Sequence, residues 1–169
     1  MKGPVIFSLN LHEETLLKTM GASVGMPTFM AGRAIVRSVL QEWGIPAEEM
    51  IQVDGSGLSR YNYITADALV SILVHITRDE KARGPFESLL PLAGREGTLA
   101  GRMRGTAAEA NARAKTGSMS NVRTIAGSVK SRDGEPIVFA ILANNFDGAA
   151  DVVTRTIDAM VVRLAEFQR

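Results

Sequence analysis

The spacing of the apolar residues changes near residue 105, and this change constrains the fold more than any other feature of the sequence. Before it, apolar residues recur at helical intervals in several segments. After it, three short segments have the pattern of strands, and a last amphipathic segment has the pattern of a helix. We therefore expect an α+β chain, with a mainly helical subdomain over residues 1–104 and an antiparallel sheet with a covering helix over residues 105–169.

Three helices are expected in the first part. LHEETLLKTMG carries an apolar stripe of Leu11, Leu16, Leu17 and Met20 and ends at Gly21. FMAGRAIVRSVLQEWGIP has helical spacing up to its closing glycine and proline, and TADALVSILVHITRD begins with Thr65 as a candidate N-cap. Between the last two lies IQVDGSGLSRYNYI, whose glycines indicate turns.

Three strands are expected in the second part, at residues 112–118, 122–130 and 136–143. VRTIAGSVK alternates in the manner of a half-buried strand, and PIVFAILA is apolar enough for a buried one. Asp133-Gly134 between them is a strong hairpin signal. The final segment should be a helix that packs across the sheet, and the apolar face expected for it consists of Val153, Ile157, Met160, Val161 and Leu164.

Composition excludes several classes of function. A net charge of +1 with scattered basic residues gives no electrostatic footprint for nucleic acid. The absence of cysteine excludes disulfides and thiolate chemistry, and no apolar run is long enough to span a membrane. His12 and His75 have no partners at metal-ligand spacing, so neither a metal nor another cofactor is expected. The opening MKGPVIFSLN lacks the apolar region of a signal peptide.

Two short motifs carry the chemistry. Ser8-Leu9-Asn10 precedes the first predicted helix, and Lys115-Thr116-Gly117 lies in the first predicted strand. Their types and order match the Ser-x-Asn and Lys-Thr-Gly motifs of penicillin-interacting enzymes. Each has a plainer interpretation: the lysine as a solvated side chain before a turn, and Ser8 and Asn10 as N-caps. DGSGLSR, which lies between the motifs, is expected to have a structural role.

Taken together, SLNLHEETLLKTMG, DGSGLSRYN and ARAKTGSM resemble the C-terminal half of the D-alanyl-D-alanine carboxypeptidase/endopeptidase family, the class C low-molecular-mass penicillin-binding proteins. The resemblance extends over essentially the whole chain. It implies part of the serine β-lactamase/penicillin-binding transpeptidase-like fold and a periplasmic or extracellular location. The implied partners are peptidoglycan D-Ala-D-Ala stem peptides, with β-lactams bound by the intact parent and no role for nucleic acid.

The resemblance also assigns roles to individual residues. Lys115 would attract the terminal carboxylate of a substrate and polarise the neighbouring serine, and Thr116 would add a hydroxyl donor to that carboxylate. Gly117 would let a peptide or β-lactam backbone lie against the strand. The backbone N–H of Ser118 would be one oxyanion-hole donor. Ser8 would shuttle a proton, and Asn10 would hold the amide carbonyl of the substrate.

The nucleophile of this family is missing from the sequence. No serine is followed three positions later by lysine, so the Ser-x-x-Lys motif is absent. We expect a C-terminal portion of a serine-type carboxypeptidase/endopeptidase that is inactive by itself. Two alternatives remain: a non-catalytic module for stem-peptide binding or assembly, and a β-lactamase remnant, which would not account for DGSGLSR.

One further expectation concerns the strand at residues 136–143. In the intact fold, N-terminal strands pair with it, and here it would present an unprotected apolar edge. The sequence therefore predicts self-association through this edge or through exchanged segments.

Overall fold

The computed structural model describes residues 7–169, and its contacts divide the chain into two compact units. Residues 8–75 form one unit, and Phe7 with residues 76–169 forms the other. In chain order the elements are α2 (Asn10–Ala22), α3 (Phe29–Glu42), η1 (Ala47–Glu49), β1 (Met50–Ile51), β2 (Tyr63–Ile64), α4 (Ala66–Arg78), α5 (Glu80–Leu89), η2 (Gly97–Leu99), β3 (Arg113–Met119), β4 (Val122–Lys130), β5 (Pro136–Asn144) and α6 (Ala150–Glu166).

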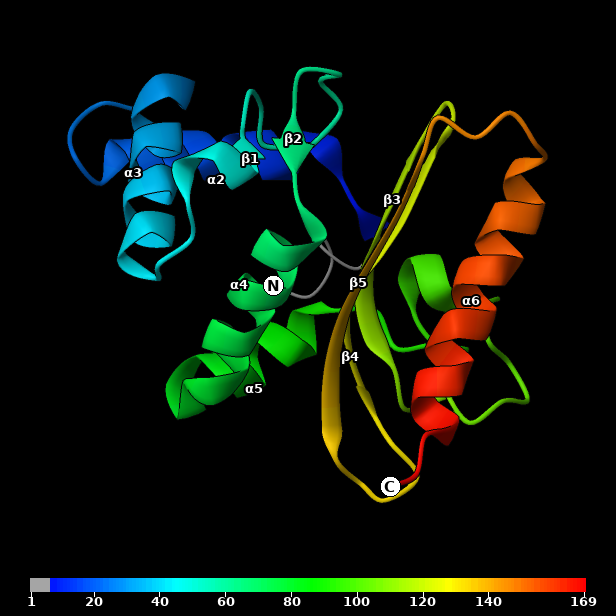
Figure 1. Ribbon diagram of the computed structural model, residues 1–169. Coiled ribbons are helices and arrows are strands. Elements are labelled where there is room, and N and C mark those ends of the chain that lie inside the picture. Colours follow the sequence, from blue (N-terminus) through cyan, green and yellow to red (C-terminus); the bar gives the residue numbers. More distant parts are fainter. Residues whose placement is uncertain (1–6) are drawn as a thin grey trace. The chain divides into compact units, whose positions relative to one another are not determined.

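The second unit is built on an antiparallel sheet with the strand order β3-β4-β5. In Figure 1, α6 runs along one face of this sheet. The three predicted strands and the C-terminal helix are thus confirmed, and the mixed α+β class with them. Gly134 has a φ of +81° in the β4–β5 turn, as the Asp-Gly signal predicted. The core between sheet and helix includes Ile125, Phe139, Ile157 and Val161.

Burial in the sheet follows from its one-sided cover. Ile125, Gly127 and Val129 on β4 are buried, and the residues that alternate with them are more exposed, as the period of two predicted. The prediction that PIVFAILA is buried throughout is wrong, because on β5 only Phe139 is buried. Pro136 and Asn144 at the ends of β5 are exposed and its remaining residues are partly exposed, since α6 covers one face of an edge strand. Met160, which was predicted to face inward, is 49% exposed.

The first unit is helical except for the short β1–β2 pair. Thr65 caps α4 as predicted, since its Oγ1 accepts a hydrogen bond of 3.0 Å from the N–H of Ala68. The predicted stripe on α2 is wrong in part: Leu17 is buried, but Leu11 and Leu16 are 76% and 59% exposed. Gly32 allows the close approach of α3 to α2, because a Cβ on this residue would overlap the backbone of Leu17.

The DGSGLSR segment folds into a turn organised by Asp54. One oxygen of its carboxylate accepts a hydrogen bond of 2.8 Å from the N–H of Gly57, and the other accepts one of 2.7 Å from the N–H of Ser59. Gly57 has a φ of +79°, which favours glycine at this position. These bonds support the structural role expected for the segment.

The sequence predicts that the helical subdomain ends at residue 104. Contacts in the structure instead group α5 and residues 90–112 with the sheet. The reason is a pair of backbone hydrogen bonds between the residues that follow α5 and the start of β3. The N–H of Ala114 donates to the carbonyl of Pro91, and the N–H of Ala93 donates to the carbonyl of Ala112, each at 2.9–3.1 Å. Residues 91–93 therefore lie along the outer edge of the chain that enters β3.

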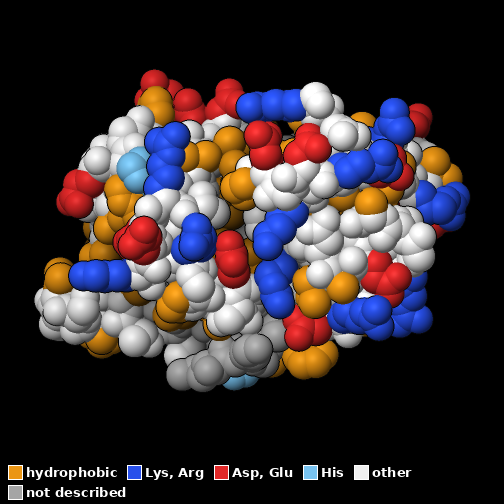
Figure 2. Space-filling view, turned by 90° about the horizontal axis from the view of Figure 1, so that it is seen from below, with side chains coloured by type: hydrophobic (Ala, Val, Ile, Leu, Met, Phe, Trp, Pro, Cys, Tyr) orange, Lys and Arg blue, Asp and Glu red, His pale blue; other side chains and the backbone are white. Residues whose placement is uncertain are grey.

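Two surface properties bear on function. On the face in Figure 2, lysine and arginine side chains are interspersed with aspartate and glutamate side chains. None of the helices formed by residues 7–169 has the length and apolarity of a membrane span.

Candidate functional site

The residues of the Lys-Thr-Gly motif lie on β3, whose pairing with β4 fixes their direction. Lys115 is opposite Ala126, and Thr116 is opposite Ile125. Side chains alternate between the two faces of a strand, so Thr116 and Ser118 share the face on which α6 packs. Lys115 and Gly117 lie on the other face. The motif therefore presents its hydroxyl groups and its ammonium on opposite faces of a single strand.

The backbone of β3 has an outer edge, away from β4, at Thr116 and Ser118. Ala114 donates its N–H outward to the carbonyl of Pro91. Because backbone groups two residues apart point to the same side of a strand, the N–H groups of Thr116 and Ser118 also point outward. Beyond Ala114, the structure of residues 7–169 shows no strand paired with this edge. An unpaired strand edge of this kind is the type that binds an extended peptide by strand addition.

Two side-chain contacts hold the motif residues in place. The Nζ of Lys115 donates a hydrogen bond of 3.0 Å to the carbonyl of Thr116. The hydroxyl of Thr116 donates one of 2.9 Å to the hydroxyl of Thr98, which lies in η2. Thr98 can therefore orient the Thr116 hydroxyl at the outer edge of the strand.

The cross-strand neighbour of Gly117 gives a structural reason for glycine at this position. Gly117 pairs with Thr124 on β4, and a Cβ on Gly117 would clash with the Oγ1 of Thr124. The missing side chain thus gives space to a neighbouring hydroxyl on the Lys115 face of the sheet.

Arg113 fixes the beginning of β3. Its Nη1 donates a hydrogen bond of 3.1 Å to the carbonyl of Leu90 and lies 3.6 Å from the carboxylate of Glu96. The Glu96 carboxylate also accepts a hydrogen bond of 3.3 Å from the N–H of Leu92. These contacts tie the strand to the segment that follows α5, two residues before Lys115.

Ser8 and Asn10 lie at the start of α2, in the other compact unit, and are described by themselves. Ser8 is half-buried and has a φ of +53°, which is uncommon for a residue with a side chain. Asn10 is the first helical residue and is exposed. The interpretation of both as N-caps is wrong, because Leu9 occupies the N-cap position and no side chain caps the helix.

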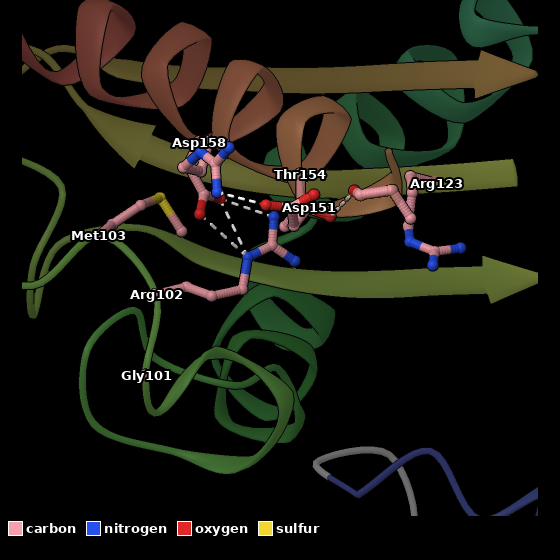
Figure 3. A pocket seen from close by; sticks show the side chains of 9 residues that line it. Gly101, Arg102, Met103, Arg123, Asp151, Thr154 and Asp158 are labelled. Atoms are coloured by element: carbon pink, nitrogen blue, oxygen red, sulfur yellow. Dashed lines mark hydrogen bonds and ion pairs between the residues drawn. The ribbon is translucent and has the colours of Figure 1, made fainter. Parts of the chain in front are cut away.

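An open depression of about 560 Å³ lies between α6 and residues 101–103 (Figure 3). Asp158 accepts hydrogen bonds of 2.6–3.2 Å from Nε and Nη2 of Arg102. Nearer the start of α6, Arg155 hydrogen-bonds to Asp151 and attracts its charge, which lowers the pKa of that carboxyl group. Arg123 from β4 also lines the depression.

Sequence reasoning missed four residues with roles around the motifs: Glu14, Thr98, Arg123 and Thr124. Two of them could have been found, because the hairpin register that places Arg123 opposite Ser118 also places Thr124 opposite Gly117. The chain between the strands is the dipeptide Ser120-Asn121, and a two-residue loop sets the hairpin register. The partners of Glu14 and Thr98 depend on contacts between distant segments and have no local signal.

Comparisons with known proteins show the family of the chain. The family model described as D-Ala-D-Ala carboxypeptidase 3 (S13) matches residues 5–167. The D-alanyl-D-alanine carboxypeptidase of Actinomadura sp. (strain R39) is 41% identical over 167 residues, which are 95% of this chain and 30% of that protein. The penicillin-sensitive carboxypeptidase A of Dictyostelium discoideum is 34% identical, over 96% of this chain and 33% of that protein.

A solved structure has the same arrangement of elements. The chain superposes on penicillin binding protein 4 from Haemophilus influenzae, in complex with a β-lactam, with a TM-score of 0.87 and 26% identity. The match covers 98% of this chain and 41% of that one. The chain thus spans about a third of the length of the curated relatives. Because the family model matches residues 5–167, the chain belongs to the D-Ala-D-Ala carboxypeptidase 3 (S13) family.

Proposed function

We propose that this chain is the C-terminal portion of a serine-type D-Ala-D-Ala carboxypeptidase/endopeptidase that acts on peptidoglycan stem peptides. The observation that carries the proposal is the open outer edge of β3, where the N–H groups of Thr116 and Ser118 point away from β4. A peptide that ends in a carboxylate can pair with this edge while its charge lies near Lys115. Such a substrate places the site in the periplasm or outside the cell.

The roles on β3 follow from the chemistry of each group. Lys115 supplies a positive charge for the terminal carboxylate of D-Ala-D-Ala, and the Thr116 hydroxyl adds a hydrogen bond to it. The N–H of Ser118 is fixed by the sheet, so it is already oriented when negative charge develops on the carbonyl oxygen. Gly117 leaves the strand free of a side chain where the ligand backbone passes.

Ser8 and Asn10 complete the proposed set from the start of α2. For Ser8 we propose proton transfer to the leaving group, the role that the resemblance of its Ser-x-Asn motif implies. Asn10 would donate its amide N–H to the carbonyl of the substrate. The left-handed backbone of Ser8 supports this proposal, because strained residues are found preferentially at functional sites.

Acylation also requires a nucleophile, which this sequence does not contain as Ser-x-x-Lys. We therefore expect the chain to bind substrate without cleaving it. Intact-mass spectrometry after incubation with excess benzylpenicillin tests this. No covalent adduct is expected, and a stoichiometric adduct would show that another serine is activated. Peptide mapping would then begin at Ser8 and Ser118.

Binding tests the site itself. The diacetylated tripeptide Lys-D-Ala-D-Ala is titrated into the ¹⁵N-labelled chain, and chemical-shift changes are expected on β3. Lys115→Ala should weaken the complex, because the carboxylate loses its counter-charge. Lys130→Ala, an exposed position on β4, is the matched control. Binding that is equal in the wild type and Lys115→Ala would overturn the assigned role.

A second function is favoured by the same absence of Ser-x-x-Lys: a non-catalytic module for stem-peptide binding or assembly. Chromatography of the peptide after prolonged incubation measures hydrolysis. Binding without hydrolysis is common to both functions, so the decisive step is addition of a separate polypeptide that carries the Ser-x-x-Lys part of a relative. Restored hydrolysis supports the C-terminal portion of a carboxypeptidase, which needs its nucleophile from another polypeptide. Absence of hydrolysis favours the non-catalytic binding module.

A further inference from the structure

Arg123 lies on β4, one strand in from the proposed substrate edge of β3. It is the direct partner of Ser118 in the β3–β4 register. Directly opposed side chains in an antiparallel pair have their Cβ atoms about 4.5–5.5 Å apart and lie on the same face of the sheet. The side chain of Arg123 therefore leaves β4 next to the Ser118 side chain, on the face shared with Thr116.

The hydrogen bonds of Arg123 fix where its charge lies. Nη1 donates to the carbonyls of Met119 and Val122, both at 2.7 Å. The Phe146 ring, whose centroid is 6.0 Å from Cζ, flanks the group. Figure 3 shows the side chain turned away from the Arg102–Asp158 pair. Since Nη1 alone makes these bonds, the donors on Nε and Nη2 have no hydrogen-bond partner among residues 7–169.

The charge of Arg123 is also uncompensated within its surroundings. Three arginines and two aspartates line the depression in Figure 3. Arg102 pairs with Asp158, and Arg155 pairs with Asp151. No carboxylate lies within ion-pair distance of Arg123 in the part of the chain that the structure describes. A guanidinium with several unused donors is suited to an oxyanion.

We propose that Arg123 is a specificity-determining residue that recognises the terminal carboxylate of the substrate, together with the hydroxyl of Ser118. This inference rests on the proposed function, since it assumes that the ligand pairs with the outer edge of β3. Lys115 then contributes positive charge from one face of the strand, and Arg123 contributes it from the other. The ligand class is a peptide with a free C-terminal carboxylate.

The test compares two ligands that differ only at this carboxylate. Diacetylated Lys-D-Ala-D-Ala and its C-terminal amide are titrated into the wild-type chain and into Arg123→Gln, Arg123→Lys and Arg163→Gln. The Arg163→Gln control removes the same charge from an exposed position on α6. The measured quantity is the ratio of the two dissociation constants, amide over acid.

The wild type should prefer the acid, and Arg123→Gln should reduce that preference about tenfold, as expected for one lost charge-assisted hydrogen bond. Arg123→Lys should keep part of the preference, and Arg163→Gln should leave it unchanged. If Arg123→Gln retains the wild-type ratio, Arg123 only braces the hairpin and the inference is overturned. A wild-type chain that binds neither ligand, or binds both equally, also overturns it.

Two further comparisons keep the result interpretable. If Arg123→Gln does not fold, Arg123→Lys decides the question: its affinity for the acid should fall several-fold while its affinity for the amide stays constant. Lys115→Ala separates this inference from the proposed function. If Arg123→Gln loses the preference for the acid and Lys115→Ala keeps it, the role assigned to Lys115 is wrong and the role assigned to Arg123 stands.

Discussion

The carboxylate of Glu14 on α2 accepts hydrogen bonds of 3.1 and 3.0 Å from the backbone N–H groups of Gly55 and Ser56. The contact joins the helix that begins after Ser8 to the DGSGLSR turn. Gly55 lies so close to α2 that a Cβ on it would overlap the backbone of Glu13. Two segments that the sequence separates by about forty positions are thus held together by one carboxylate and one glycine.

Glu14→Gln should destabilise the first unit by about 1–2 kcal/mol, because a neutral amide replaces a carboxylate that accepts two hydrogen bonds. Urea unfolding at pH 7 measures the loss. Glu48→Gln, at an exposed position in the same unit, is the control and should leave the free energy of unfolding nearly unchanged. Equal effects of the two substitutions would contradict the anchoring role.

Glu14 should also make stability depend on pH. Burial raises the pKa of its carboxyl group. Hydrogen bonds from the Ser56 side chain and from the backbone N–H groups of Gly55 and Ser56 lower it by more than burial raises it, so the pKa lies below the ordinary 4.5. A lowered pKa in the folded state means that the contribution is complete above pH 4.5 and disappears as the pH falls through the folded value. The difference in unfolding free energy between wild type and Glu14→Gln should shrink over this range. A constant difference would contradict the assignment.

Gly127→Ala should destabilise the sheet by about 1–3 kcal/mol through overpacking. A Cβ at this position would collide with the carbonyl of Arg113 and with Ala114, both of which belong to the β3 backbone. At Gly117 the obstacle is the rotatable hydroxyl of Thr124, so Gly117→Ala should be milder. Thermal unfolding measures both variants. Gly148→Ala, with no atom near the added Cβ, is the control.

The ion pair between Arg102 and Asp158 should contribute more than the one between Arg155 and Asp151. The side chains of the first pair are 20% and 18% exposed, and those of the second are 68% and 65% exposed. Water and salt screen the second pair far more strongly.

A double-mutant cycle with Arg102→Gln and Asp158→Asn should give a coupling energy of about 1–2 kcal/mol that persists at high salt. The same cycle on Arg155 and Asp151 should give a smaller coupling that salt removes. Equal couplings would show that the lower exposure of the Arg102–Asp158 pair adds nothing to stability.

The sequence predicts the strands of this chain better than its short elements. β4 and β5 are long enough to show their period and turn chemistry, and their predicted bounds match the structure within one residue. α5 was missed because Gly84 and Pro85 interrupt it. The helix forms nevertheless, since the Asp79 side chain accepts hydrogen bonds from the N–H groups of Lys81 and Ala82.

In the candidate site, the sequence likewise predicts residues that are neighbours in the chain and misses those that only the fold brings together. Lys115, Thr116, Gly117 and Ser118 are neighbours in the chain, so one strand brings them together, and a short motif is enough to find them. Glu14 and Thr98 act on partners 42 and 18 positions away, at distances that only tertiary packing determines. A single sequence has no periodic pattern that reports such contacts.

At the outer edge of β5 we expect a second copy of the chain to pair. The β3–β4–β5 ladder directs the N–H groups of the odd residues of β5 toward β4, so the N–H of Ala140 points outward. Sedimentation velocity over a wide range of concentrations should show reversible association of the wild type. Ala140→Pro removes the outward donor without removing a ladder bond, so it should shift the equilibrium toward monomer. Ala140→Val keeps the N–H and should associate like the wild type. A chain that is monomeric at every concentration would refute the pairing of this edge.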